Sequence, residues 1–169
     1  MAYQVNEVVV YGSSGVFRVE DITVKKIGGQ EMEYYVLKPI YEHGGSTIYV
    51  PIHNGRLAGK LRRPLSRREI LELLDTLPED APAWIENQNE RRDKYREILS
   101  TAAPCSMVRA VRALYRHRRE QEARGKRLYI ADERFLKEAE RLIEDEFAVS
   151  LEIEPKEVRL FIEHRLQTA

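Results

Sequence analysis

The sequence predicts an α+β protein in which a small antiparallel β-barrel precedes a region of about five helices. Two observations carry this prediction. Residues 1–60 contain short runs of β-branched and aromatic residues separated by glycine-rich turns, whereas residues 61–169 repeat apolar residues at helical spacing. With 169 residues, of which 43% are hydrophobic and 33% charged, the chain is long enough to bury a core without disulfide bonds.

The expected strands are short and closely spaced. They are residues 8–11, 16–26, 34–37 and 47–50. Four or five strands with such short connections favour a small barrel or a curled sheet. Pro51 ends the last run, and because proline cannot donate a hydrogen bond to a neighbouring strand, we expect an open edge beside it.

The expected helices begin with a capping box at Ser66 and Glu69. They are residues 67–77, 86–100, 106–124 and 132–151, and a last helix that begins at Pro155. Each carries an apolar stripe of helical period. Because the period changes near residues 60–65, the sequence predicts two domains, residues 1–60 and 61–169.

The chain lacks the residue patterns of an enzyme or a metal site. Its single cysteine, Cys105, excludes a disulfide framework and a cysteine-based zinc site, and its four histidines are not at metal-ligand spacing. We therefore expect no catalytic residue, no metal ligand and no cofactor. No apolar run approaches the ~20 residues that span a bilayer, and no signal peptide is evident, so a cytoplasmic, non-membrane protein is expected.

Positive charge is concentrated in one stretch of a chain whose net charge is zero. Residues 91–127 hold 12 basic and 4 acidic residues, a net charge of +8. Such a patch attracts a polyanion, but mixed-charge helix faces are also common, so both a nucleic-acid surface and a solvated face remain open. Within the stretch, Arg116, Arg118 and Arg119 end the third helix, where they complement the helix dipole or project into solvent.

Trp84 is the only tryptophan and follows a proline-rich segment. A single tryptophan near a helix start usually anchors a core or a domain interface. The alternative is an exposed wedge beside basic residues, of the kind that enters the minor groove at a weakened base step. The residues alone favour the anchor.

Several short motifs follow one another along nearly the whole chain. In the first half they are Val9-Val10-Tyr11, Gly15-Val16, Tyr34-Tyr35-Val36-Leu37-Lys38 and Ile48-Tyr49-Val50-Pro51; in the second they are Trp84, Val111-Arg112-Ala113-Leu114-Tyr115, Gly125-Lys126-Arg127-Leu128 and Glu146-Phe147-Ala148. In this order they resemble the CarD-type transcription regulators of bacteria, whose N-terminal module also occurs in the transcription-repair coupling factor.

The resemblance implies a Tudor-like domain at residues 1–60 that binds the β subunit of RNA polymerase. It implies a helical domain at residues 61–169 that meets promoter DNA at the upstream edge of the melted bubble and modulates open-complex stability. Trp84 matches the family's wedge, while Lys25 and Tyr49 align with polymerase contacts. The expected DNA-contacting cations are Arg91, Arg92, Arg116, Arg118, Arg119 and Lys126. Tyr129 stands where other members place a helix-capping serine.

This hypothesis describes a non-enzymatic, monomeric regulator associated with the nucleoid through RNA polymerase. One alternative is an adaptor that does not bind DNA and whose β domain takes up a strand from a partner. Another alternative is a small hydrolase, for which the sequence offers no nucleophile–base spacing.

Overall fold

The computed structural model describes residues 2–77 and 84–167. The chain divides into two compact units, Met1–Leu65 and Ser66–Ala169. The first unit is built on strands and the second on helices, so the α+β class predicted from the sequence is confirmed.

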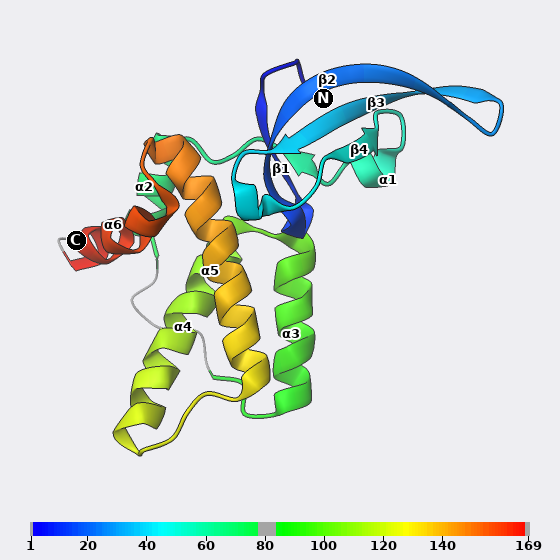
Figure 1. Cartoon of the computed structure of the whole chain (residues 1–169). Coiled ribbons are helices and arrows are strands. Elements are labelled where there is room, and N and C mark those ends of the chain that lie inside the picture. The colour runs from blue at the N-terminus through cyan, green and yellow to red at the C-terminus, as the bar shows by residue number, and fades with distance from the viewer. Residues whose placement is uncertain (1, 78–83, 168–169) are drawn as a thin grey trace. The chain divides into compact units, whose positions relative to one another are not determined.

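The first unit contains a five-stranded antiparallel sheet with the strand order β4-β3-β2-β1-β5 (Figure 1). Its strands are β1 (Val8–Tyr11), β2 (Gly15–Ile27), β3 (Gln30–Pro39), β4 (Ile48–Pro51) and β5 (Leu61–Arg62). The expected small barrel is not closed, because β4 and β5 form the two edges of the sheet and do not pair with each other. With four and two residues, these strands are too short to supply the staggered ladder that closure needs.

Strands β2 and β3 extend past their neighbours as a two-stranded ribbon. Strand β1 pairs with the start of β2 and strand β4 with the later part of β3, so residues 24–33 have no third strand beside them. The turn at the end of the ribbon uses Gly28 and Gly29 at φ angles of 60° and 83°. Glycine adopts these angles without strain, as a two-residue hairpin turn requires.

The core of the first unit is built from inward-facing residues of the strands. Val9, Phe17, Leu37 and Val50 are fully buried, as the alternation of side chains along a strand allows. Three short helical elements connect the strands: η1 (Gly12–Ser14), η2 (Glu42–Gly44) and α1 (Gly55–Ala58). The sequence analysis missed α1, whose first turn is capped by the Asn54 side chain through a 3.1 Å hydrogen bond from the Leu57 amide.

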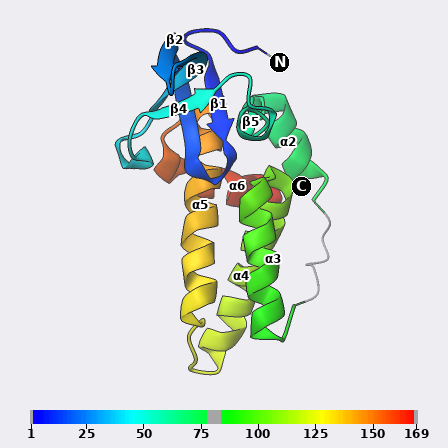
Figure 2. The same cartoon turned by 90° about the vertical axis from the view of Figure 1, so that its right-hand side faces the viewer.

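In the described part, the second unit contains five helices, as predicted. They are α2 (Arg67–Asp75), α3 (Gln88–Thr101), α4 (Pro104–Ala123), α5 (Ile130–Leu151) and α6 (Pro155–Gln167). Figure 2 shows α3, α4 and α5 side by side, and α6 packs against α5 and α2. The predicted capping box is present, since the Glu69 amide donates to Ser66 Oγ (3.1 Å) and the Ser66 amide to Glu69 Oε2 (2.7 Å). Helix α4 begins two residues earlier than expected, with Pro104 in its first turn.

Candidate functional site

The Trp84 side chain is half-buried at the start of the segment that leads into α3. Its ring stacks on the His117 ring of α4, with ring centres 3.6 Å apart and an angle of 12° between the planes. The proline-rich residues that precede it, 78–83, lie outside the described residues. The indole is therefore neither sealed in the core nor fully free: one part rests on α4 and another faces solvent.

Arg91 is a buried structural residue rather than a free cation. Its Nε and Nη2 atoms donate to the two carboxylate oxygens of Asp132 on α5, at 2.7 and 2.9 Å. Its Nη1 atom donates to the carbonyl oxygens of Ile85 (2.8 Å) and Glu86 (3.4 Å). Only 4% of Arg91 is exposed, so its expected role as a phosphate contact does not fit the structure: its donors are directed inward and its charge is already paired.

This guanidinium ties the Trp84 segment to the helices around it. Desolvation lowers the pKa of Arg91, but the hydrogen bonds and charge of Asp132 outweigh that effect, so its pKa lies above the ordinary value. Its central carbon lies 4.7 Å from the centre of the Trp84 ring. Because it also holds two carbonyl groups of the segment, Arg91 fixes the direction in which the chain leaves Trp84.

A hollow of about 230 Å³ lies beside the indole, between α3 and α4. Its apolar wall includes Tyr95, Ile98 and Leu114, and its lining also includes the cations Lys94 and Arg109. Tyr95 stacks on Phe135 with ring centres 4.0 Å apart, and burial raises the pKa of its hydroxyl. The sequence analysis did not single out Lys94 or Arg109, because only the folded helices bring them next to Trp84.

The remaining expected DNA-contacting cations have different surroundings. Arg92 on α3, Arg116 and Arg119 on α4, and Lys126 in the loop after α4 are exposed. Arg118 is half-buried, with its guanidinium carbon 5.0 Å from the centre of the Tyr115 ring. The structure thus places four of these side chains in contact with solvent, and turns Arg118 toward an aromatic ring.

Lys25 and Tyr49, the expected polymerase contacts, lie next to each other in the first unit. The Lys25 ammonium of β2 is 3.6 Å from the centre of the Tyr49 ring of β4. This is a cation–π contact, and 45% of Tyr49 remains exposed. Because β4 is an edge strand, the pair lies beside backbone groups that are not bonded to a further strand of the sheet.

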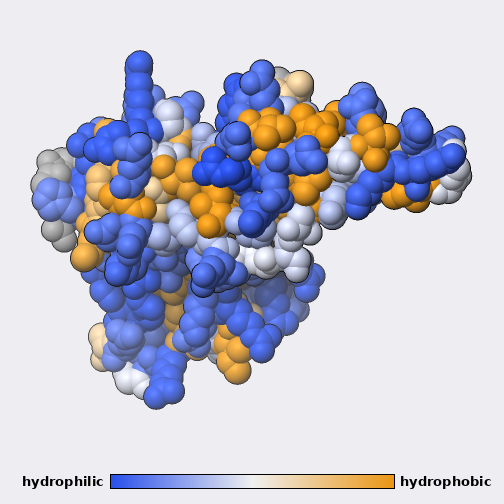
Figure 3. Space-filling view, turned by 45° about the horizontal axis from the view of Figure 1, so that its top comes forward, coloured by the Kyte–Doolittle hydropathy of each residue, from blue (hydrophilic) through white to orange (hydrophobic). Residues whose placement is uncertain are grey.

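Apolar side chains gather over the β2–β3 ribbon in Figure 3. The exposed large apolar residues of β2 are Ile22, Val24 and Ile27, with exposed fractions of 38%, 57% and 57%. Because side chains alternate along a strand, Ile22 and Val24 lie on one face of β2 and Ile27 on the other, so aliphatic surface is exposed on both faces.

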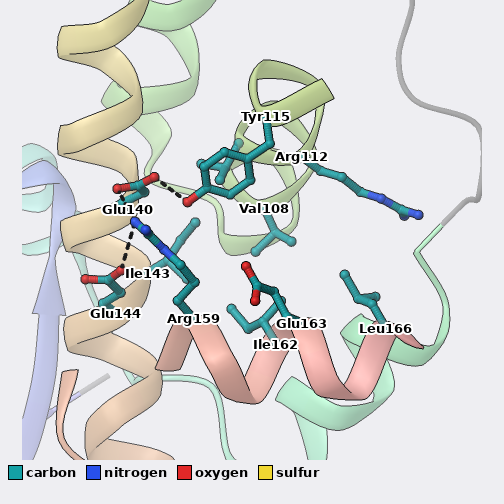
Figure 4. Close-up of a pocket in the computed structure, with 11 residues that line it drawn as sticks. Val108, Arg112, Tyr115, Glu140, Ile143, Glu144, Arg159, Ile162, Glu163 and Leu166 are labelled. Carbon is teal, nitrogen blue, oxygen red and sulfur yellow. Dashed lines mark hydrogen bonds and ion pairs between the residues drawn. The ribbon is translucent and has the colours of Figure 1, made fainter. Parts of the chain in front are cut away.

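A second hollow, of about 100 Å³, lies between α4, α5 and α6 (Figure 4). Arg159 of α6 reaches between two carboxylates of α5, at 2.8 Å from Glu140 and 3.9 Å from Glu144, and the Tyr115 hydroxyl donates to Glu140. Burial raises the pKa of both Tyr115 and Glu144. These groups bind one another, and the described residues that line the hollow include no serine, cysteine or histidine.

None of the helices among residues 2–77 and 84–167 is both long and apolar enough to cross a membrane. Within the same residues, no group of three or more histidine, cysteine, aspartate or glutamate side chains is arranged to hold a metal ion.

Comparison with protein families finds a match over the first unit. Residues 3–64 match the family described as the CarD-like/TRCF RID domain. The match covers the whole sheet, including Lys25, Tyr49 and the β2–β3 ribbon.

Proposed function

Residues 3–64 form a CarD-like/TRCF RID domain, a domain that interacts with RNA polymerase, and from this premise we propose that the chain is a bacterial transcription regulator. The CarD family consists of non-enzymatic transcription regulators. In this proposal the sheet binds the β subunit of the polymerase. The helical unit contacts promoter DNA at the upstream edge of the bubble and alters the lifetime of the open complex.

The polymerase contact is proposed at the β4 edge and the adjoining ribbon. An open edge offers backbone donors and acceptors in a row, which a strand of the partner can pair with. Lys25 adds a positive charge beside that edge, and Tyr49 adds a large half-exposed ring. Tyrosine is enriched at protein interfaces, and the lysine charge favours a partner surface of the opposite sign.

The DNA contact is proposed at Trp84, and the observation that carries it is the way this indole is held. It is partly exposed, rests on His117, and is fixed from behind by the buried Arg91–Asp132 pair. A ring held in this way loses little conformational entropy when it enters a base step. The entropic cost therefore offsets less of the favourable stacking energy.

The proposed phosphate contacts are revised to exclude Arg91. Arg92, Arg116, Arg119 and Lys126 remain in the set because their side chains are exposed, and Arg118 remains a weaker member. Arg109 joins them, because it lines the hollow beside Trp84 and lies two helical turns before Arg116 on the same side of α4. Each phosphate that these cations neutralise releases counterions from the DNA.

The test is the open-complex lifetime of RNA polymerase on one promoter with wild-type protein, Trp84→Ala and His117→Ala. We expect Trp84→Ala to shorten the lifetime by about fivefold or more, since one stacked base contributes about 1–3 kcal/mol. His117→Ala removes the stacking partner but keeps the indole, so it controls for the loss of the ring–ring contact. Polymerase binding should be unchanged in both variants.

An unchanged lifetime with Trp84→Ala, at full polymerase occupancy and an unchanged melting temperature, would contradict the DNA contact. That result would favour the adaptor alternative, which the open β4 edge supports independently. A variant that no longer folds would instead identify Trp84 as a core anchor; Trp84→Phe, which keeps an aromatic ring, then separates stability from DNA contact.

A further inference from the structure

The N-terminus of α5 carries two exposed apolar residues that the proposed function does not use. Tyr129 is 58% exposed and Ile130 is 70% exposed. They directly follow the loop that contains Lys126 and Arg127, both of which are exposed. An exposed aromatic residue next to cations is the arrangement with which proteins bind unstacked bases and their phosphates.

The side chain of Tyr129 does not cap the helix that it begins. It occupies the N-cap position of α5, and its side chain makes no capping hydrogen bond. Serine, threonine, asparagine or aspartate at this position would satisfy one of the free amide groups of the first turn. A large ring therefore occupies a position at which a small polar residue would stabilise the helix more.

The Tyr129 ring and the Trp84 ring both lie near the guanidinium of Arg91. The central carbon of Arg91 lies 4.7 Å from the centre of the Trp84 ring and 5.8 Å from that of the Tyr129 ring, so the two ring centres are at most about 10.5 Å apart. Bases along one DNA strand are spaced by about 3.4 Å, so both rings fall within about three nucleotides of each other. The Arg91–Asp132 pair fixes the two rings at once, because it joins α3 to α5.

The surface beside Tyr129 is hollowed and includes an exposed cation, Arg92. A hollow of about 320 Å³ is lined by Gln88, Arg91, Arg92, Leu128, Tyr129 and Ile130, among other residues. Of the acidic groups at this end of α5, Asp132 is paired with Arg91, while Glu133 is exposed. Arg92 lines this hollow together with Tyr129, and the exposed cations Lys126 and Arg127 precede Tyr129 in the chain, so they add positive charge that favours a polyanion.

We propose that Tyr129 is a second aromatic DNA contact, which binds a base of the separated strand beside the one that Trp84 engages. This inference rests on the proposed function and adds to it a second stacking position and the strand segment that it takes. Single-stranded DNA fits because each base has a face that stacks on an aromatic ring, and each phosphate can pair with the neighbouring cations.

The decisive variant is Tyr129→Ser in the full-length protein. Serine caps the helix, so the melting temperature should stay equal or rise, whereas a merely structural tyrosine would lower it when replaced. The binding probe is a labelled DNA duplex with a four-nucleotide unpaired end, compared with the fully paired duplex by fluorescence anisotropy. We expect Tyr129→Ser to weaken binding of the forked DNA by about tenfold and to change binding of the paired DNA by less than about twofold.

Two further variants are the controls. Tyr129→Phe keeps the ring and should retain the affinity for forked DNA. Leu160→Ser removes an exposed apolar side chain, 69% exposed, from α6 and should leave the affinity unchanged. If Tyr129→Ser binds the forked DNA normally while Trp84→Ala does not, the second contact is refuted and the proposed function stands.

Other outcomes are equally informative. If neither Trp84→Ala nor Tyr129→Ser weakens forked-DNA binding, the proposed DNA contact fails and the inference fails with it. If Tyr129→Ser leaves DNA binding intact but lowers retention on RNA polymerase, the α5 tip is a protein contact and the inference is likewise overturned.

Discussion

Arg91 is the residue whose position matters most for the helical unit. A positive charge in a basic stretch suggests a phosphate contact, yet this guanidinium is 4% exposed and bound in two-pronged fashion to Asp132. Its donors satisfy the carbonyl groups of the segment after Trp84, and its face lies against two aromatic rings. The buried Arg91 therefore fixes the positions of Trp84 and Tyr129, which lie at the surface beside exposed cations.

At the residue scale, we predict that Asp132→Ala lowers the free energy of unfolding by about 3–5 kcal/mol, because it leaves Arg91 charged and unpaired in the interior. Arg91→Met should lower the free energy of unfolding by a similar amount, because it leaves the Asp132 carboxylate charged and unpaired in the interior. The double variant, Arg91→Met with Asp132→Ala, should lower the free energy of unfolding by less than the two single changes together. Urea denaturation of the four proteins measures this coupling. Strict additivity would show that the two side chains do not depend on each other.

At the scale of elements, two ion pairs add to the packing that holds the last helix on the helices before it. Arg159 of α6 binds Glu140 of α5, and Arg165 of α6 binds Asp75 at the end of α2. Both bonds of the Asp75 pair are short, at 2.8 Å and 2.7 Å. Helix α6 thereby connects α2 to α5, and it lines the hollow of Figure 4 together with α4 and α5.

The Asp75 pair predicts a pH dependence of this packing. Hydrogen bonds from Arg165 lower the pKa of the Asp75 carboxyl below its ordinary value of 3.8. Since the folded state has the lower pKa, the contribution of the pair to stability is present above that value and is lost as the pH falls through the folded pKa. Asp75→Asn should therefore lower the melting temperature at about pH 6 and have a smaller effect at about pH 3. An equal effect at both pH values would contradict the assignment.

At the scale of the whole molecule, periodicity predicts the elements better than it predicts their closure. The strand runs and helical stripes are local, so they identify the α+β class, five helices and the Ser66 capping box. Whether the sheet closes depends on the lengths of its edge strands, β4 and β5. In the sequence, Pro51 indicates where β4 ends, but no comparable residue indicates the length of β5. The resemblance to CarD-type regulators, stated from the motifs, agrees with the match over residues 3–64.

The candidate site is harder to predict for a reason that Arg91 and Tyr129 illustrate. Both are identified by partners distant in sequence: Asp132 lies 41 residues after Arg91, and Trp84 joins Tyr129 only through that guanidinium. Composition counts Arg91 as one more positive charge, although its charge is neutralised inside the fold. The contact between Lys25 and Tyr49 has the same origin, because it bridges β2 and β4 across β3.

The last prediction concerns how the two units work together. A net charge of +8 over residues 91–127 supports only weak DNA binding, so promoter occupancy should depend on attachment to the polymerase. Attachment through the sheet raises the local concentration of the helical unit to about the millimolar range without any new DNA contact. Lys25→Glu should therefore abolish the effect on open-complex lifetime at low protein concentration while leaving the affinity for free DNA unchanged.

Lys60→Glu, an equal charge change just before the opposite edge strand β5, is the matched control. Raising the Lys25→Glu concentration should restore the effect; a loss that persists at saturating protein would show that the sheet does more than tether the helices.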